Sequence, residues 1–258
     1  MKQTKNILIF FLLFNFIFSD ENKKLDIVSF NIHGFKTNKI AYKVNMIIDK
    51  IQDFDLFFIQ ENWVYDNLFL KKIFNHNLIF GNKKNKTIYD TGLTIGYTKA
   101  FKLIKQEEIL FDQCNGIIFQ GADCLASKGF ILLRLNYNGQ VLDIYNTHLD
   151  SGNSLKDKKT RKYQLEVLEN YIYNNSLNHS MIISGDFNIN YIDEYEMIDN
   201  FAKNLLLEFE FNKSNHVVDY IFYSSNENFY LGEDSFSNYD TLKYLSDHIP
   251  VFLNLDIK

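Results

Sequence analysis

The chain has 258 residues, 46% of them hydrophobic and 23% charged, and its formal net charge at pH 7 is −5. This length and composition support one large core, and a single proline with 11 glycines argues against long linkers between several domains. The acidic balance argues against tight electrostatic binding of nucleic acid, and no cluster of Lys and Arg is large enough to suggest it. A nuclease stays open, because a bound divalent cation can supply local positive charge.

The N-terminal segment has the pattern of a secretory signal peptide. Two lysines precede an almost entirely apolar run at residues 7–18, and the small Ser19 follows it, before two acidic residues. We expect residues 1–19 to be a signal peptide and residues 20–258 to form one secreted domain with a charge of −7. An uncleaved anchor is the alternative, although the apolar run is shorter than the roughly 20 residues of a membrane span.

The hydrophobic pattern of the N-terminal half alternates between strands and helices. In chain order it predicts a strand at 25–30, a helix at 40–51, a buried strand at 56–59, a short helix at 66–74, and strands at 92–97 and 101–104. Glu61 comes directly after the second strand, where a lone glutamate is usually just solvated. Beside Asn31, at the end of the neighbouring strand, it becomes a candidate ligand for a hard cation, since Mg²⁺ takes oxygen ligands.

Two cysteines, Cys114 and Cys124, lie in one loop region. In a secreted protein we expect them to form a disulfide that closes a short loop, worth roughly 2–4 kcal/mol. Free thiols are the alternative if the signal peptide is not one. Metal binding by two cysteines without a nearby histidine is disfavoured.

The C-terminal half continues the alternation. It predicts strands at 130–135 and 141–145 joined by a hairpin turn at Asn138-Gly139, a helix at 157–174, a strand at 181–183, a helix at 191–207, and strands at 217–222 and 251–255. The helix at 157–174 has a basic patch, for which a solvated surface is the expectation and contact with phosphates or anionic headgroups the alternative. The residues of this patch are Lys158, Lys159, Arg161 and Lys162.

Polar residues also follow strands in this half. Asp186 and Asn188 come after a strand and a turn, and residues two apart in an extended chain point to the same side. His148 follows another strand in the same way. Hydrogen-bonded turn residues are the alternative for all three. Their shared position at strand ends, where α/β proteins usually carry their chemistry, favours a functional site.

Asp219 lies within a predicted buried strand, where a carboxylate without a partner is costly. His248, which stands just before the last predicted strand, is its natural partner. An imidazole near neutral pH can act as a base, and a carboxylate on its other nitrogen would fix its orientation. The sequence therefore predicts an Asp219–His248 pair.

Six short motifs stand in the order expected of the endonuclease/exonuclease/phosphatase superfamily, which includes deoxyribonuclease I, inositol polyphosphate phosphatases and neutral sphingomyelinases. The motifs are Ser29-Phe30-Asn31, Gln60-Glu61, Asn146-Thr147-His148, Gly185-Asp186-Phe187-Asn188, Val218-Asp219-Tyr220 and Ser246-Asp247-His248-Ile249-Pro250. From about Leu25 to its C-terminus the chain resembles this superfamily.

Within the superfamily, the segment from Gly121 to Phe130, with Cys124 followed by Ser-Lys-Gly, is similar to the secreted sphingomyelinases. The chain departs from the bacterial members between Asn188 and Asp219, where those enzymes carry a longer insert with an apolar membrane-touching hairpin.

The resemblance implies an α+β fold, a four-layer α/β/β/α sandwich of two mixed β-sheets flanked by helices. It also implies a secreted phosphodiesterase that depends on Mg²⁺, with Mn²⁺ or another divalent cation as the alternative, and cleaves sphingomyelin to ceramide and phosphocholine. A secreted deoxyribonuclease-I-like endonuclease acting on nucleic acid, and a catalytically idle binding protein of the same fold, are the other hypotheses. We expect a monomer, for which peripheral membrane contact stays open.

The same resemblance implies which residues would bind the metal and which would act as the base. Glu61, with Asn31 nearby, would hold the metal against a phosphate oxygen. His248, oriented by Asp219, would deprotonate a water molecule for in-line attack on the phosphodiester.

The remaining candidates would act on the phosphate and the water. By the resemblance, Asp186 and Asn188 would orient both groups. His148 would donate to the phosphate or assist the departing alkoxide. Asp247 would assist the metal or the base, and Lys128 is a further candidate for which a structural role is the alternative.

Overall fold

The computed structural model describes residues 23–34, 38–85, 87–116, 123–212, 214, 216–226, 229–232 and 237–257. The predicted signal peptide at residues 1–19 lies outside the described residues, as do Gly121 and Ala122 of the segment similar to sphingomyelinases. In the described part of the chain, no helix combines the length and apolarity needed to span a membrane.

Two six-stranded sheets form the centre of the described structure. The strands of the first sheet are β1 (Lys23–Asn31), β2 (Leu56–Gln60), β3 (His76–Phe80), β4 (Thr94–Thr98), β11 (Phe229–Leu231) and β12 (Val251–Ile257). Those of the second are β5 (Phe101–Leu110), β6 (Gly129–Tyr137), β7 (Gln140–His148), β8 (Ser180–Asp186), β9 (Glu208–Glu210) and β10 (Asp219–Tyr223). Their spatial orders are β11-β12-β1-β2-β4-β3 and β5-β6-β7-β8-β10-β9.

Both sheets are mixed. β1 runs parallel to β2 and antiparallel to β12, and β7 runs parallel to β8 and antiparallel to β6. The predicted Asn138-Gly139 turn joins β6 to β7, with φ angles of 52° and 92° that suit a tight hairpin.

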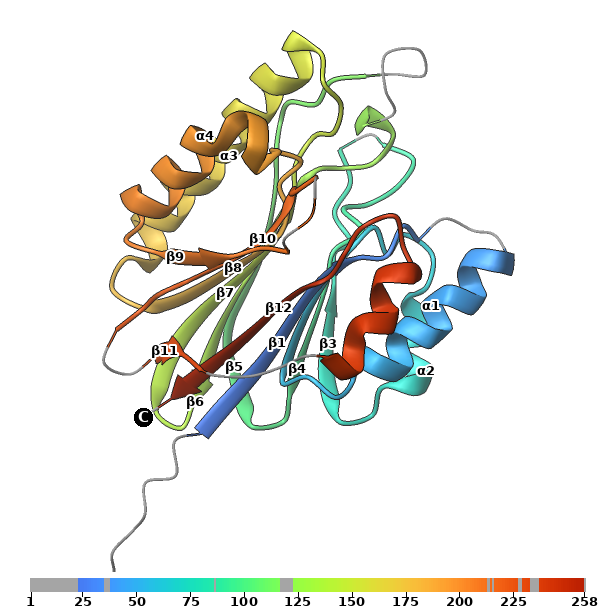
Figure 1. Ribbon diagram of the computed structural model, residues 1–258, viewed down its shortest axis with the longest axis vertical. Helices are drawn as coiled ribbons and strands as arrows, with labels where there is room; N and C mark the ends of the chain where they lie inside the picture. Colours follow the sequence, from blue (N-terminus) through green and yellow to red (C-terminus); the bar gives the residue numbers. More distant parts are fainter. Residues whose placement is uncertain are drawn as a thin grey trace, which may run out of the picture.

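Helices cover the outer faces of the two sheets (Figure 1). The helices α1 (Asn38–Ile51) and α2 (Asp66–Lys72) and the 3₁₀ helix η2 (Ser237–Tyr244) pack on the first sheet. The helices α3 (Leu155–Ser176) and α4 (Tyr191–Asn204) pack on the second. The expected four-layer α/β/β/α sandwich is confirmed.

The apolar runs of the central strands follow from burial on both faces. In β2, Leu56 and Phe58 belong to the cluster between the sheets, whereas Phe57 and Ile59 belong to the cluster beneath α1 and α2. Side chains alternate across a strand, so a strand buried on both faces must be apolar throughout. This is why a continuous apolar run, without alternation, indicated the strand at 56–59.

Strand direction places the predicted site residues at one edge of the sandwich. Asn31, His148 and Asp186 end the strands β1, β7 and β8. Asp219 begins the antiparallel β10 and pairs with Asp186 across the ladder. Because antiparallel strands start where their neighbours end, both kinds of strand bring polar residues to the same edge.

Several predicted boundaries were wrong for local reasons. The helix expected at 66–74 ends at Lys72, and β3 follows it, a strand hidden by its polar start at His76. The strand expected at 101–104 continues to Leu110, past a shift in its register with β6. Its second half contains several charged residues, which hid it from the hydrophobic pattern. The helix expected to reach residue 207 ends at Asn204, since Leu206 has a φ of 56°. The three-residue strands β9 and β11 were not predicted.

Candidate active site

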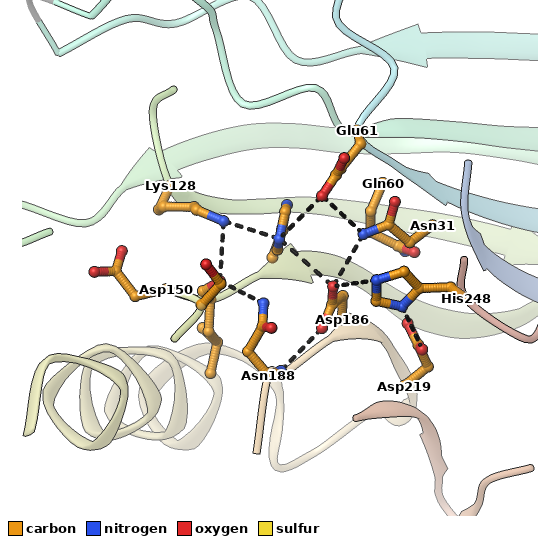
Figure 2. Close-up of polar contacts among 12 residues, drawn as sticks. Asn31, Gln60, Glu61, Lys128, Asp150, Asp186, Asn188, Asp219 and His248 are labelled. Atoms are coloured by element: carbon orange, nitrogen blue, oxygen red, sulfur yellow. Dashed lines mark hydrogen bonds and ion pairs between the residues drawn. The ribbon is translucent and has the colours of Figure 1, made fainter. Parts of the chain in front are cut away.

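Two carboxylates from different sheets meet at the amide of Asn31. Glu61 follows β2 and Asp186 ends β8. Nδ2 of Asn31 lies 3.1 Å from Oε1 of Glu61 and 3.0 Å from Oδ2 of Asp186 (Figure 2). Oδ1 of Asn31 accepts a hydrogen bond from the backbone N–H of His33 at 3.0 Å. The amide therefore holds the two like-charged carboxylates beside each other.

These carboxylates fit a divalent cation. Oε2 of Glu61 is buried and accepts no hydrogen bond from any residue that the structure describes. Burial raises the pKa of Glu61, and burial together with the charge of Asp219 raises the pKa of Asp186 to about 6. Potential ligand atoms of Glu61, His148 and Asp186 lie within 4.8 Å of one another. A hard cation would satisfy the open oxygen and offset the crowded charge.

His248 and Asp219 form the pair expected from the sequence. Nδ1 of His248 donates to Oδ2 of Asp219 at 2.8 Å, which leaves Nε2 on the side of Asp186, 3.7 Å from its Oδ2. Burial lowers the pKa of His248, but the charges of Asp186 and Asp219 outweigh it and raise the pKa to about 10. A cation beside Asp186 would oppose those charges, so its binding favours the neutral imidazole that a base needs.

His148 and Lys128 form a second buried pair. Nε2 of His148 lies 2.8 Å from Nζ of Lys128, and because an ammonium can only donate, the imidazole nitrogen accepts. Burial and the charge of Lys128 lower the pKa of His148. Nζ of Lys128 also donates to the carbonyl of Leu149 at 3.0 Å and lies 3.2 Å from Oδ1 of Asp123. On this side of the site the cationic donor is Lys128.

Asn188 and Asp247 lie at different depths. Asn188 has a φ of 52°, its N–H donates to Oδ1 of Asp186 at 2.9 Å, and its Nδ2 donates to the carbonyl of Leu149 at 3.0 Å. The Asp247 side chain is 62% exposed, and its Oδ2 lies 3.3 Å from Nδ1 of His33. Asn188 is thus fixed by the loop after β7, whereas Asp247 stands at the rim.

One pocket of about 290 Å³ collects most of the predicted site residues. Glu61, Lys128, His148, Asp186, Asn188, Asp247 and His248 line it. Asn31 and Asp219 do not line it, but each is hydrogen-bonded to residues that do.

The sequence analysis missed further lining residues, among them His33, Trp63, Tyr89, Asp123 and Ser151. Two of them carried a usable signal, because His33 and Trp63 each lie two residues after a strand-end candidate. The other three reach the pocket only through tertiary contacts.

Arg161 corrects the predicted basic patch. Only 1% of it is exposed, and its Nη1 donates to the carbonyls of Asp150, Ser151 and Gly152 at 3.2, 3.2 and 2.6 Å. Oε1 of Glu194 lies 3.6 Å from Nη2. The loop after β7 turns its carbonyls inward, and the arginine satisfies them, which is why this one cation of the patch is buried.

The expected disulfide between Cys114 and Cys124 is present. Next to the two cysteines, Asn115 and Asp123 contact the segment after β7. The N–H of Asn115 donates to Oδ2 of Asp150 at 2.5 Å, and Oγ of Ser151 donates to Oδ2 of Asp123 at 2.7 Å. The closed loop thereby brings Asp123 to the pocket.

Comparison with known proteins gives a family match over most of the chain. A family model described as Endonuclease/Exonuclease/phosphatase family 2 matches residues 28–215. Sphingomyelinase C of Listeria ivanovii is 28% identical over 122 residues, which are 45% of this chain and 34% of the relative. The sphingomyelinase of Mycobacterium bovis is 33% identical over 82 residues, 31% of this chain and 16% of the relative. The matched segments thus span less than two thirds of either relative.

Solved structures share the fold at low identity. SmcL gives a TM-score of 0.69 at 18% identity, over 90% of this chain and 99% of that one. A humanized D. rerio TDP2 gives 0.68 at 18%, also over 90% and 99%. A Staphylococcus aureus beta toxin mutant with bound magnesium ions gives 0.67 at 16%, over 92% and 100%. Such likeness establishes the sandwich and leaves the substrate open.

Proposed function

The chain belongs to Endonuclease/Exonuclease/phosphatase family 2, and on that premise we propose that it is a secreted, Mg²⁺-dependent phosphodiesterase that hydrolyses sphingomyelin to ceramide and phosphocholine. The observation that carries the reaction is one pocket holding Glu61 and Asp186 opposite the paired imidazole of His248. The sphingomyelinase relatives support the substrate, and the magnesium-bound beta toxin supports the metal. The N-terminal pattern of residues 1–19 supports export.

Hydrolysis of a phosphodiester requires that negative charge be offset as the nucleophile approaches. Glu61 and Asp186 would hold the cation, which when bound supplies Lewis-acid polarisation of a phosphate oxygen. Asn31 keeps both carboxylates in place through its Nδ2. As a ligand through its own oxygen, Asn31 would have to turn its amide over and release the N–H of His33.

His248 is the proposed general base. Its Nε2 takes a proton from water, while Asp219 accepts the Nδ1–H, fixes the tautomer and offsets the imidazolium charge that forms. Asp186, 3.7 Å from that Nε2, is placed to accept a hydrogen bond from the same water.

Lys128 is proposed to donate to the phosphate or the departing alkoxide in place of its present ion pair with Asp123, because its other two N–H groups are directed at His148 and the carbonyl of Leu149. His148 accepts one of its protons and so orients the ammonium, a change from the donor role expected of His148. Asn188 would contact the phosphate from the side of the loop after β7, where its Nδ2 donates to the carbonyl of Leu149. Asp247 would act at the rim of the pocket through its contact with His33.

A substrate panel tests this function. Sphingomyelin vesicles, lysophosphatidylcholine, inositol phosphates and plasmid DNA are incubated with the protein in Mg²⁺ and in EDTA. The expected result is release of phosphocholine from sphingomyelin in Mg²⁺ alone. Cleavage of plasmid without phosphocholine release would favour the nuclease hypothesis, and no turnover of any substrate would favour a binding protein.

The nuclease hypothesis is supported by one finding, the fold shared with D. rerio TDP2 in complex with a single-strand DNA product. The net charge of −5 opposes it, because binding of a polyanion depends on neutralising phosphates with basic side chains.

A further inference from the structure

Two aromatic rings form one wall of the pocket. Trp63 and Tyr89 both line it together with Glu61, and their ring centroids are 5.6 Å apart with an angle of 34° between the planes. Trp63 follows Glu61 by two residues, so the wall lies beside the proposed cation site. A group esterified to a phosphate at Glu61 would have this wall as a neighbour.

The backbone beneath each ring is fixed. Gly92 has a φ of 63°, and a Cβ at this position would lie 2.5 Å from Nε1 of Trp63, so the indole rests directly on the glycine. The N–H of Asn62 donates to the carbonyl of Gly92 at 2.8 Å. The N–H of Tyr89 donates to the carbonyl of Leu125 at 3.0 Å. A wall built in advance costs a ligand little ordering entropy.

The charge around the wall is negative. The carboxylates that line the pocket are those of Glu61, Asp123, Asp186 and Asp247, against one lysine, Lys128, and three imidazoles. Asp66 and Asp90 lie close in sequence to Trp63 and Tyr89: Nδ2 of Asn62 donates to Asp66 at 2.9 Å, and the N–H of Gly92 donates to Asp90 at 3.0 Å. Once the proposed cation offsets the charges of Glu61 and Asp186, Asp66 and Asp90 would still attract a positively charged group that contacts the rings.

An aromatic face within a negative field has one obvious complement. The face of indole and phenol rings attracts cations, and a quaternary ammonium makes this contact best, because it is weakly hydrated and has no N–H to satisfy. A nucleobase would also stack on the wall, but its polyanionic chain would oppose the field.

We propose that Trp63 and Tyr89 form the subsite for a quaternary ammonium group esterified to the scissile phosphate. This rests on the proposed function, because it presumes that the phosphate sits at Glu61. It makes the ring pair the element that selects a choline ester among phosphodiesters.

Trp63 is the sole tryptophan of the sequence, so its fluorescence reports directly on the subsite. The full protein is titrated in Mg²⁺ with phosphocholine and with 3,3-dimethylbutyl phosphate, which has the same shape without the positive charge of the ammonium. We expect phosphocholine to change the fluorescence and to bind about tenfold more tightly than the isostere. Equal binding of the two, or tighter binding of thymidine 5′-monophosphate, would overturn the subsite.

Kinetics separate this inference from the proposed function. The p-nitrophenyl esters of phosphocholine and of dimethylbutyl phosphate are compared for the wild type and for Trp63→Ala, Trp63→Phe and Tyr89→Leu. We expect Trp63→Ala to lower kcat/KM for the choline ester about tenfold more than for the isostere, and Trp63→Phe to restore much of that preference. Val64→Ala, an exposed neighbour that does not line the pocket, should match the wild type.

The outcomes are distinguishable. A wild type that cleaves choline esters but keeps its full preference in Trp63→Ala and Tyr89→Leu would overturn the subsite and leave the proposed function standing. A wild type that cleaves no choline ester in Mg²⁺ would contradict the proposed function, and the fluorescence titration would then decide the subsite by itself.

Discussion

Single atoms decide how the residues of the pocket act. The imidazole of His248 has one nitrogen bound to Asp219 and the other turned toward Asp186. In contrast, the Nε2 of His148 is taken by Lys128. The two histidines that were candidates in the sequence therefore have different chemistry, because different neighbours fix their protons.

Loss of the proposed base should be severe. His248→Ala is expected to lower kcat by about 10²–10⁴-fold while the circular dichroism spectrum stays that of the wild type. His248→Gln is the second variant, as it retains a donor for the buried Asp219 but cannot take a proton. Activity near the wild-type level in both would remove His248 from the mechanism.

Asp66 should make stability depend on pH. Burial and the charge of Asp90 raise its pKa from 3.8 to about 6, so the folded protein binds a proton there that the unfolded chain has already released. The stability that this proton contributes is complete below about pH 4 and is lost as the pH rises through about 6. Asp66→Asn keeps an acceptor for Asn62 without the charge.

The Tm of Asp66→Asn relative to the wild type should therefore rise between pH 4 and 6 and stay constant above that. Asp53→Asn, on the exposed turn after α1, serves as the control. A Tm difference that is the same at pH 4 and pH 7 would contradict this assignment.

Among the elements, α3 anchors the loop that follows His148 at the end of β7. Its N-terminus has a capping box, in which Oγ of Ser154 accepts from the N–H of Asp157 at 3.2 Å and Oδ2 of Asp157 accepts from the N–H of Ser154 at 2.8 Å. Arg161, on the next turn, holds the carbonyls of the same loop. The capping box and the hydrogen bonds of Arg161 together position the segment after β7.

Removal of the cap should destabilise the protein without touching the pocket. Ser154→Ala is expected to lower the free energy of unfolding by about 1 kcal/mol, because the N–H of Asp157 loses its acceptor. Ser154→Thr retains the hydroxyl and should stay close to the wild type. Urea denaturation measures both, and an Ala variant as stable as the Thr variant would show that the cap contributes nothing.

The elements also show where the sequence pattern was sufficient. Strands buried on both faces, such as β2 and β8, and the helix α3 were predicted because each has a local hydrophobic signal. β3 and β9 were missed, since β3 has a polar start at His76 and β9 has only three residues. The burial of Arg161 could not be predicted either, as it depends on carbonyls of a loop that the helix pattern does not reveal.

On the scale of the whole molecule, the site depends on the alignment of the two sheets. Asn146 on β7 crosses between them: its Nδ2 donates to the carbonyls of Ile59 and Thr94 at 2.9 and 3.0 Å, and its Oδ1 accepts from Gln60 at 2.7 Å. All four residues are buried. This tether holds the edge that carries Glu61 against the edge that carries His148 and Asp186.

Asn146→Ala should loosen this alignment. The loss of three buried hydrogen bonds is expected to lower the free energy of unfolding by about 2–4 kcal/mol, since buried polar groups would be left unpaired. Activity should fall as well. Asn136→Ala, near the far end of β6, is the control. A variant with wild-type stability in urea would contradict a role for the tether.

The six motifs predicted most of the residues that form the site, but not how their side chains are arranged. Strand ends could be recognised from local patterns, and their convergence followed from the family's sandwich. Which proton sits on which nitrogen, and the entry of Tyr89 into the pocket, depend on contacts between segments far apart in the chain.

Calorimetric titration of Mg²⁺ into the wild type and into Glu61→Gln tests the central claim most directly, because it measures the cation site without any substrate. The wild type should bind Mg²⁺, Glu61→Gln should bind it at least about tenfold more weakly, and Glu166→Gln, an exposed carboxylate of α3, should match the wild type. Equal Mg²⁺ affinity in the wild type and Glu61→Gln would contradict the account.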